Sequence, residues 1–166
     1  MRWNLAHLTF ALFVLQQLDA IFLPTPAAVV TEMLRMAHVG PGDVVYDLGS
    51  GDGRIPIAAA KAFGARGVGI DLDGTRTIEA RENARRAGVD RRVTFITGSL
   101  YDADLSGATV VTLYMGQAVN MKMRPKLRME LKPGSRVVSH AFDMGDWMPD
   151  ETRTVDGRPV FLWTIR

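Results

Sequence analysis

The chain has 166 residues, of which 47% are hydrophobic and 23% are charged, and this composition is ordinary for one globular domain with enough core to fold alone. A formal net charge of +2 is too small to argue for a nucleic-acid-binding protein. The absence of cysteine excludes disulfide bonds and thiolate metal sites, and the three histidines lack metal-ligand spacing, so we predict no metal site.

Residues 1–23 form a largely apolar segment with an amphipathic helical pattern. Its large apolar residues recur every three or four positions, at Leu5, Leu8, Leu12, Leu15, Leu18 and Phe22. We expect a helix docked on the core or on a second copy of the chain, which would give a homo-oligomer of a cytoplasmic protein. The alternative is a degenerate signal segment or a membrane-surface helix, with a secreted or membrane-associated protein. The domain itself then covers residues 24–166.

The next elements lead to a glycine-rich turn. A helix is expected at residues 27–37 and a buried strand at residues 44–48, and the strand stops at the pattern D-x-G-x-G-x-G. A dinucleotide-binding turn, G-x-G-x-x-G, would need a glycine at Arg54. The observed pattern is that of class I methyltransferases that use S-adenosylmethionine (SAM); a purely structural turn is the alternative. The turn residues expected to contact SAM are Asp47, Gly49, Ser50, Gly51 and Gly53, with Asp47 paired to the cationic amino-acid end.

A second acidic residue follows at the distance that such a site requires. After a helix at residues 54–63, the strand 66–71 ends in Asp71, about 20 residues beyond the turn, where an acid hydrogen-bonds ribose hydroxyls. Leu72, next to it, is also assigned to the cofactor. Asp73 is predicted to cap the helix at residues 75–87, which Gly88 ends.

The remaining pattern alternates strand and helix and ends in a hairpin. Strands are expected at residues 93–96, 108–114 and 136–140, with a helix at 117–131 that Pro125 kinks or starts, and hairpin strands at 152–155 and 160–165 around Asp156-Gly157. The predicted fold class is therefore α/β: a Rossmann-like class I methyltransferase sheet, mostly parallel with an antiparallel C-terminal hairpin strand, in a minimal single domain.

In open sheets of this kind the ligand lies beyond the carboxyl ends of the strands. Ser99 and Leu100 follow the third strand, where they would meet the adenine. Tyr114 and Asn120 follow the fourth strand, where the methyl group should be presented. His140 ends the fifth strand and is the best titratable candidate near pH 7, although a structural role is the simpler interpretation.

Several of these segments resemble the small archaeal broad-specificity protein lysine methyltransferases and their mitochondrial relatives, which methylate lysines of inner-membrane proteins. The similar segments are residues 24–26, 110–115, 119–120, 124–127, 131–134, 136–140 and 145–147. The resemblance implies transfer of a methyl group from SAM to a protein or peptide lysine, leaving S-adenosylhomocysteine. Tyr114 and Asn120 would orient the amine, Tyr114 would also contact SAM, and Thr25 would close one side. Ser99 departs from the acidic residue that is common in the family, and the segment before Leu23 has no counterpart.

The short connections between the expected elements favour a protein as the methyl acceptor over a small molecule. Residues 102–107 leave no room for a full helix, so the site should be open enough to admit a side chain of a folded protein. A small-molecule N- or O-methyltransferase, the alternative, would need added walls, for example from a second copy of the chain. We do not expect a nucleic-acid substrate, because Leu-Tyr-Met-Gly follows the fourth strand in place of an Asn-Pro-Pro-Tyr type loop. A SAM-binding module without catalysis is the remaining hypothesis.

Overall fold

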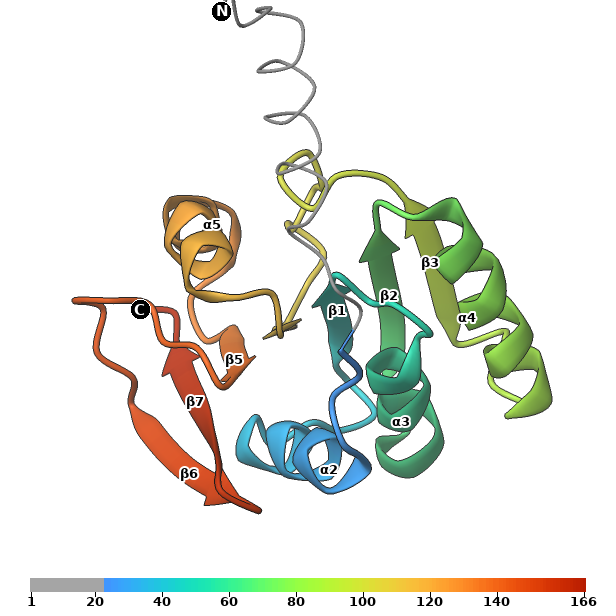
Figure 1. The fold of residues 1–166 in the computed structure, drawn as a ribbon, viewed down its shortest axis with the longest axis horizontal. Helices are drawn as coiled ribbons and strands as arrows, with labels where there is room; N and C mark the ends of the chain where they lie inside the picture. The colour runs from blue at the N-terminus through green and yellow to red at the C-terminus, as the bar shows by residue number, and fades with distance from the viewer. Residues whose placement is uncertain (1–22) are drawn as a thin grey trace, which may run out of the picture.

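A seven-stranded sheet with the order β3-β2-β1-β4-β5-β7-β6 organises the computed structural model, which describes residues 23–166 (Figure 1). The five strands from β3 to β5 in this order are parallel to one another, whereas β7 is antiparallel to both β5 and β6. The strands are β1 Val44–Leu48, β2 Arg66–Asp71, β3 Val93–Thr97, β4 Val110–Leu113, β5 Arg136–His140, β6 Glu151–Val155 and β7 Arg158–Thr164. This arrangement confirms the predicted fold class.

The helical segment predicted at residues 1–23 lies outside the described residues apart from Leu23, and the proposed division at residue 24 stays a prediction.

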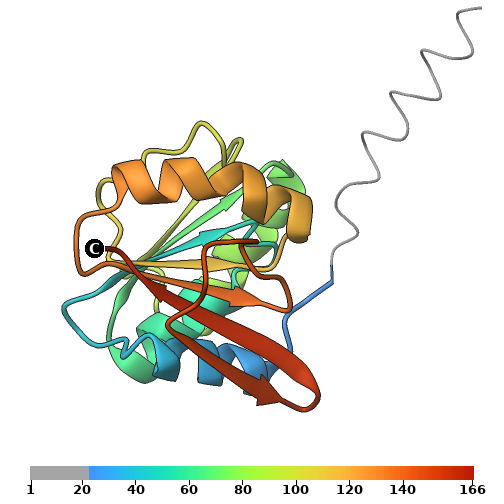
Figure 2. The same ribbon diagram turned by 90° about the vertical axis from the view of Figure 1, so that its left-hand side faces the viewer.

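Helices cover both faces of the sheet. Three of them, α2 (Ala27–Met36), α3 (Arg54–Phe63) and α4 (Gly74–Arg86), pack on one face through two apolar clusters, and α5 (Gln117–Glu130) packs on the other face through a third. Figure 2 shows α5 across the sheet from α2 and α3. Because α2 and α3 share a face, the start of α3 comes close to the segment that leads into α2, and this proximity matters for the site.

The sequence pattern predicted that Pro125 kinks α5 or starts its main segment. The helix starts at Gln117 and runs to Glu130 with Pro125 inside it, so Pro125 does not start it, and the kink stays a prediction. Proline removes one backbone N–H and so leaves the carbonyl of Met121 without its helical partner. Pro125 and Met121 both lie on the exposed side of the helix, where water can satisfy that carbonyl.

The terminal hairpin is tighter than predicted. Asp156 and Gly157 form a two-residue turn, both with positive φ, at 49° and 74°. Such a pair matches the twist of the flanking strands. Arg158 therefore pairs directly with Val155, and β7 starts two residues earlier than expected. Strand β4 is shorter than the expected residues 108–114, because it starts at Val110 and ends at Leu113, so Tyr114 follows the strand.

Candidate functional site

The glycine turn between β1 and α3 is held in shape by backbone hydrogen bonds to the neighbouring strand. The N–H groups of Gly49 and Ser50 donate to the carbonyl of Ile70 at 2.8 and 3.0 Å. Gly53 has a φ of 79°, and a Cβ there would lie 2.6 Å from the ring of Phe95, which is itself buried. Both the backbone conformation and the packing therefore require glycine at position 53.

Asp71 lies against the same turn. One carboxylate oxygen accepts the N–H of Gly51 at 2.7 Å, and the other accepts the N–H of Asp73 at 2.9 Å. Each oxygen keeps a lone pair for a further donor, such as a hydroxyl group. Asp73 caps α4 as predicted, accepting from the N–H of Thr75 at 2.8 Å. Asp47 and Asp71, the two acidic residues that the sequence linked by their spacing, thus both lie next to the glycine turn.

Asp47 is a buried carboxyl group in an acidic environment. It is 4% exposed and accepts a hydrogen bond from the hydroxyl of Thr112 at 2.7 Å. The pKa of Asp47 is raised from 3.8 to about 7; burial is the main cause, the hydrogen bond from Thr112 opposes it, and the charges of Asp71 and Asp52 add to it. A cationic ligand group would remove the cost of the buried negative charge.

The turn has the features that a SAM-sized ligand needs. The hydroxyl of Ser50 is buried and lacks a hydrogen-bond partner, although buried hydroxyls normally have one. Asp47 offers a negative charge for an ammonium group, and Asp71 offers acceptors for ribose hydroxyls. The residues present therefore fit the cofactor predicted from the sequence.

Ser99 and Leu100, which were assigned to the adenine, and Leu72, which was assigned to the cofactor, differ in how they are placed. Leu72, after β2, is 78% exposed, which leaves an apolar side chain free to pack on a ligand ring. Leu100 packs against the α5-side core, and the hydroxyl of Ser99 already accepts the N–H of Tyr101 at 3.2 Å. A hydroxyl can accept a second hydrogen bond, so the predicted contact of Ser99 with an adenine amine stays a prediction.

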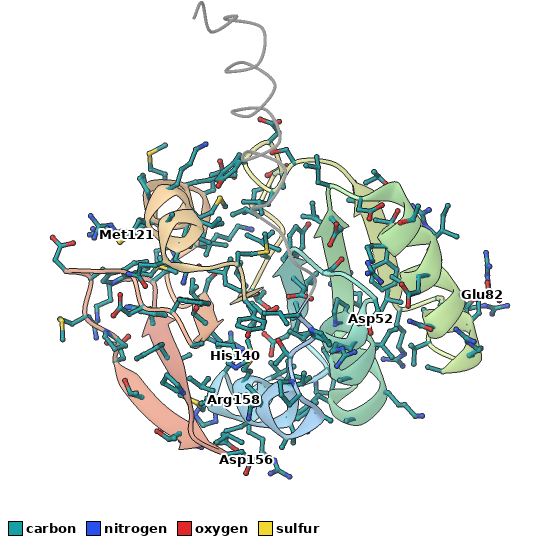
Figure 3. All side chains as sticks on the ribbon, viewed as in Figure 1. Asp52, Glu82, Met121, His140, Asp156 and Arg158 are labelled. Atoms are coloured by element: carbon teal, nitrogen blue, oxygen red, sulfur yellow. The ribbon has the colours of Figure 1, made fainter. Side chains whose placement is uncertain are left out.

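A cluster of Tyr114, His140 and Thr25 lies at the carboxyl ends of β4 and β5. The rings of Tyr114 and His140 have centroids 3.9 Å apart, and the Thr25 hydroxyl lies 3.4 Å from Nδ1 of His140. Figure 3 labels His140 near the middle of the molecule and Arg158 below it. Burial lowers the pKa of His140 to about 4, and the positive charge of Arg158 adds to the effect. His140 is therefore neutral at pH 7, with a buried Nε2 that has no partner.

The backbone next to His140 is strained. Ala141 has a φ of 67°, a conformation that costs an alanine about 1–2 kcal/mol. The N–H of Phe142 donates to the carbonyl of His140 at 2.9 Å, which closes a tight three-residue turn. The turn brings the Phe142 ring to 6.1 Å from that of Tyr114.

Asn120 is completely buried on α5 and holds the loop that follows β5. Its amide nitrogen donates to the hydroxyl of Ser139 and to the carbonyl of Phe142, both at 2.9 Å. Its side-chain oxygen is buried and lacks a partner. The structure thus gives Asn120 an anchoring role, and its predicted role in orienting an amine stays a prediction.

The structure adds residues that the sequence did not single out. Thr112 lies opposite Asp47 in the β1–β4 register, which only the strand order reveals. Arg54 donates to both carboxylate oxygens of Asp52 and to the carbonyl of Thr25, and Asn83 donates to the carbonyl of Asp52. The only sequence signal for Arg54 was the lack of a glycine at its position.

Two other features are absent from residues 23–166. This part of the chain contains no helix long and apolar enough to cross a membrane, and no group of three or more potential metal ligands.

Known proteins are similar to this chain in sequence and in fold. The family model of the ANTKMT methyltransferase domain matches residues 47–151. A protein-lysine N-methyltransferase of Saccharolobus islandicus is 44% identical over 149 residues, which cover 87% of this chain and 92% of that protein. The mouse adenine nucleotide translocase lysine N-methyltransferase is 32% identical over 133 residues, which cover 80% of this chain and 58% of that protein. The chain thus spans less than two thirds of the length of the mouse relative.

A similar solved structure is described as an RNA methyltransferase from Salinibacter ruber in complex with S-adenosyl-L-homocysteine. It has a TM-score of 0.85 and 55% sequence identity to this chain, and the match covers 86% of this chain and 94% of that one.

Proposed function

The chain belongs to the family of ANTKMT methyltransferase domains and is a SAM-dependent methyltransferase, and we propose that its methyl acceptor is the side-chain amine of a protein lysine. The observation that carries the proposal is the 44% identity to the Saccharolobus islandicus protein-lysine N-methyltransferase over 92% of its length. A match of this extent covers both the cofactor side and the acceptor side of the sheet edge.

The cofactor side supports transfer from SAM. Bound SAM supplies an electrophilic methyl group on a sulfonium. Asp47 and Asp71 would hold its ammonium and its ribose, and Ser50 has a free hydroxyl beside them. Because these groups lie on a turn fixed by strand β2, the contribution of the chain is to position the donor.

The residues on the acceptor side of the site support an amine as the methyl acceptor. A lysine has an ordinary pKa of about 10.4 and must lose its proton before it can attack. Contact with the partly buried ring of Tyr114 and the buried ring of His140 would lower that pKa by desolvation. His140 is neutral and adds no charge that would repel the incoming cation, but a group with a pKa of about 4 is a weak base at pH 7. We therefore assign His140 to shaping the acceptor pocket with Thr25 and Tyr114, and we assign no general base.

Methyl-labelled SAM tests the proposal directly. The purified protein is incubated with labelled SAM and a cell extract, and the extract is then separated into protein, RNA and small molecules. We expect label in the protein fraction, recovered as methyl-lysine after hydrolysis, and loss of label with the Asp71→Asn variant. Label only on small molecules would replace the lysine proposal by the small-molecule alternative. SAM binding without any label would indicate a binding module.

RNA is the second candidate acceptor, because the Salinibacter ruber structure at 55% identity is described as an RNA methyltransferase. The same experiment separates the two. Label that ribonuclease releases, with none in methyl-lysine, would favour RNA over protein.

A further inference from the structure

Arg54 connects two parts of the site that are far apart in the sequence. Its Nη2 lies 2.6 Å from Oδ2 of Asp52 and its Nε lies 3.0 Å from Oδ1, so the guanidinium holds the carboxylate with two nitrogens. Its Nη1 donates to the carbonyl of Thr25 at 3.0 Å. Asp52 belongs to the glycine turn, whereas Thr25 belongs to residues 24–26, which we call the proline segment. One side chain thus joins the cofactor turn to the proline segment.

The proline segment in turn contacts the acceptor side. The Thr25 hydroxyl lies 3.4 Å from Nδ1 of His140, and the His140 ring packs on Tyr114. Figure 3 shows Asp52 and His140 on opposite sides of the segment that enters α2. The direct contacts therefore run in the order Asp52, Arg54, Thr25, His140 and Tyr114.

Both ends of this series are attached to secondary structure, whereas its middle, Thr25, lies in the loop before α2. The carbonyl of Asp52 accepts the side-chain amide of Asn83 on α4 at 2.9 Å, and His140 is part of β5. Pro24 and Pro26 have no N–H groups, so the backbone around Thr25 can donate few hydrogen bonds. The polar contacts of the segment are made by the carbonyl of Pro26, which accepts the N–H of Val30, and by the carbonyl and hydroxyl of Thr25. Arg54 binds the carbonyl of Thr25.

Arginine suits this task better than lysine. Its planar fork can hold a carboxylate with two nitrogens while a third points elsewhere, whereas an ammonium is a single point charge. The side chains of Arg54 and Asp52 are 37% and 16% exposed, so the pair is only partly screened by water.

We propose that Arg54 is a positioning residue that couples cofactor binding at the glycine turn to the placement of the proline segment beside His140 and Tyr114. A ligand held by Asp47 and Asp71 restrains the turn, and with it Asp52, further than its own hydrogen bonds do. Arg54 passes that order to Thr25, which forms one side of the acceptor pocket. The part of the inference that concerns the acceptor rests on the proposed function. By linkage, an acceptor bound beside Thr25 strengthens cofactor binding by the same factor.

Amide hydrogen exchange tests the coupling without any acceptor. The full chain is measured with and without S-adenosylhomocysteine, and exchange is followed at Thr25 and at residues 27–30, the start of α2. We expect the ligand to slow exchange there about tenfold in the wild type. Arg54→Met should lose this effect while its affinity for S-adenosylhomocysteine stays within about threefold. Arg54→Lys should show an intermediate effect. Arg85→Met is the matched control, since it removes an exposed ion pair with Glu82 on α4, and it should behave as the wild type.

Methyl transfer to the labelled protein fraction gives a second measurement. Arg54→Met should lower kcat/KM for the acceptor about 10- to 100-fold at saturating SAM, because a misplaced pocket wall costs rate more than cofactor affinity. The proposal is wrong if the ligand protects residues 25–30 equally in Arg54→Met, or if the wild type shows no protection. It is also wrong if cofactor affinity and kcat/KM fall by the same factor in both Arg54 variants. A lack of protein methylation would refute the lysine acceptor but leave the exchange test intact.

Discussion

Replacing Asp47 by asparagine should stabilise the ligand-free protein at neutral and alkaline pH. The pKa of Asp47 is raised from 3.8 to about 7, so between these values the folded chain holds a proton that the unfolded chain has released. The free energy of unfolding therefore falls as the pH rises from about 4 to 7 and levels off above 7. Three pH units between the two pKa values correspond to about 4 kcal/mol.

Asp47→Asn has no charge to bury and keeps an oxygen that can accept the hydroxyl of Thr112. Its stability advantage over the wild type should be about 1 kcal/mol at pH 4.5 and about 4 kcal/mol at pH 8. Urea denaturation of both proteins at the two pH values measures this difference. Taking the difference between the variants removes the contributions of other groups that titrate, His140 among them.

The same substitution should weaken the cofactor site. Asp47→Asn loses the carboxylate that pairs with the ammonium of SAM, so SAM affinity should fall by about 10- to 100-fold in calorimetry at pH 7.5. In the wild type the affinity should decrease as the pH falls below 7, because protonated Asp47 cannot pair. A variant that is less stable than the wild type at pH 8, or an advantage that does not change with pH, would show that Asp47 is not a buried charge.

Three further substitutions probe other parts of the site. Asp71→Asn should raise the Kd for SAM about 10- to 100-fold, through loss of charge-assisted hydrogen bonds to the ribose, and a Kd within threefold of the wild type would refute that assignment. Gly53→Ala should cost about 2–5 kcal/mol in urea denaturation, because a Cβ would meet Phe95 at 2.6 Å in a left-handed backbone; Gly98→Ala, with open space around it, should cost under about 0.5 kcal/mol. The free energy of unfolding of the wild type should fall by about 3 kcal/mol between pH 6.5 and pH 4, because His140 binds a proton in the unfolded chain but stays neutral in the folded one. His140→Asn should not show this fall, and equal pH profiles of the two proteins would contradict the lowered pKa.

Local patterns predicted most of the features of the candidate cofactor site. The glycine turn, Asp71 and the cap at Asp73 are set by neighbours within a few residues or by one strand-helix-strand unit, and the structure places all of them together. The hairpin turn at Asp156-Gly157 is local as well, although its tightness moved the strand ends. Such patterns do not give the order in which the strands lie side by side in the sheet. Thr112 comes to lie opposite Asp47 only because β4, 65 positions away, is the neighbour of β1.

Arg54 and Asn120 illustrate a second limit. Arg54 was informative in the sequence only because it is not glycine, and its contact with Thr25 depends on α2 and α3 sharing a face of the sheet. Asn120 was assigned to the amine because it follows the fourth strand, whereas in the structure its amide nitrogen anchors the loop after β5. Position at a sheet edge predicts that a side chain is near the ligand. It does not predict which of its atoms are already engaged.

Buried polar atoms without a hydrogen-bond partner identify the site at the carboxyl ends of the strands without the use of any sequence motif. In the described part of the chain, the buried side-chain atoms that lack a hydrogen-bond partner are Ser50 Oγ, Asn120 Oδ1 and His140 Nε2. They come from the segments that follow or end β1, β4 and β5, where Asp47 is a buried acid and Ala141 has a strained backbone. Each of these features costs folding free energy, and packing elsewhere must offset that cost. Their concentration at one edge is expected if bound cofactor and acceptor complete the missing interactions, and a fold selected for stability alone would have no reason to gather them there.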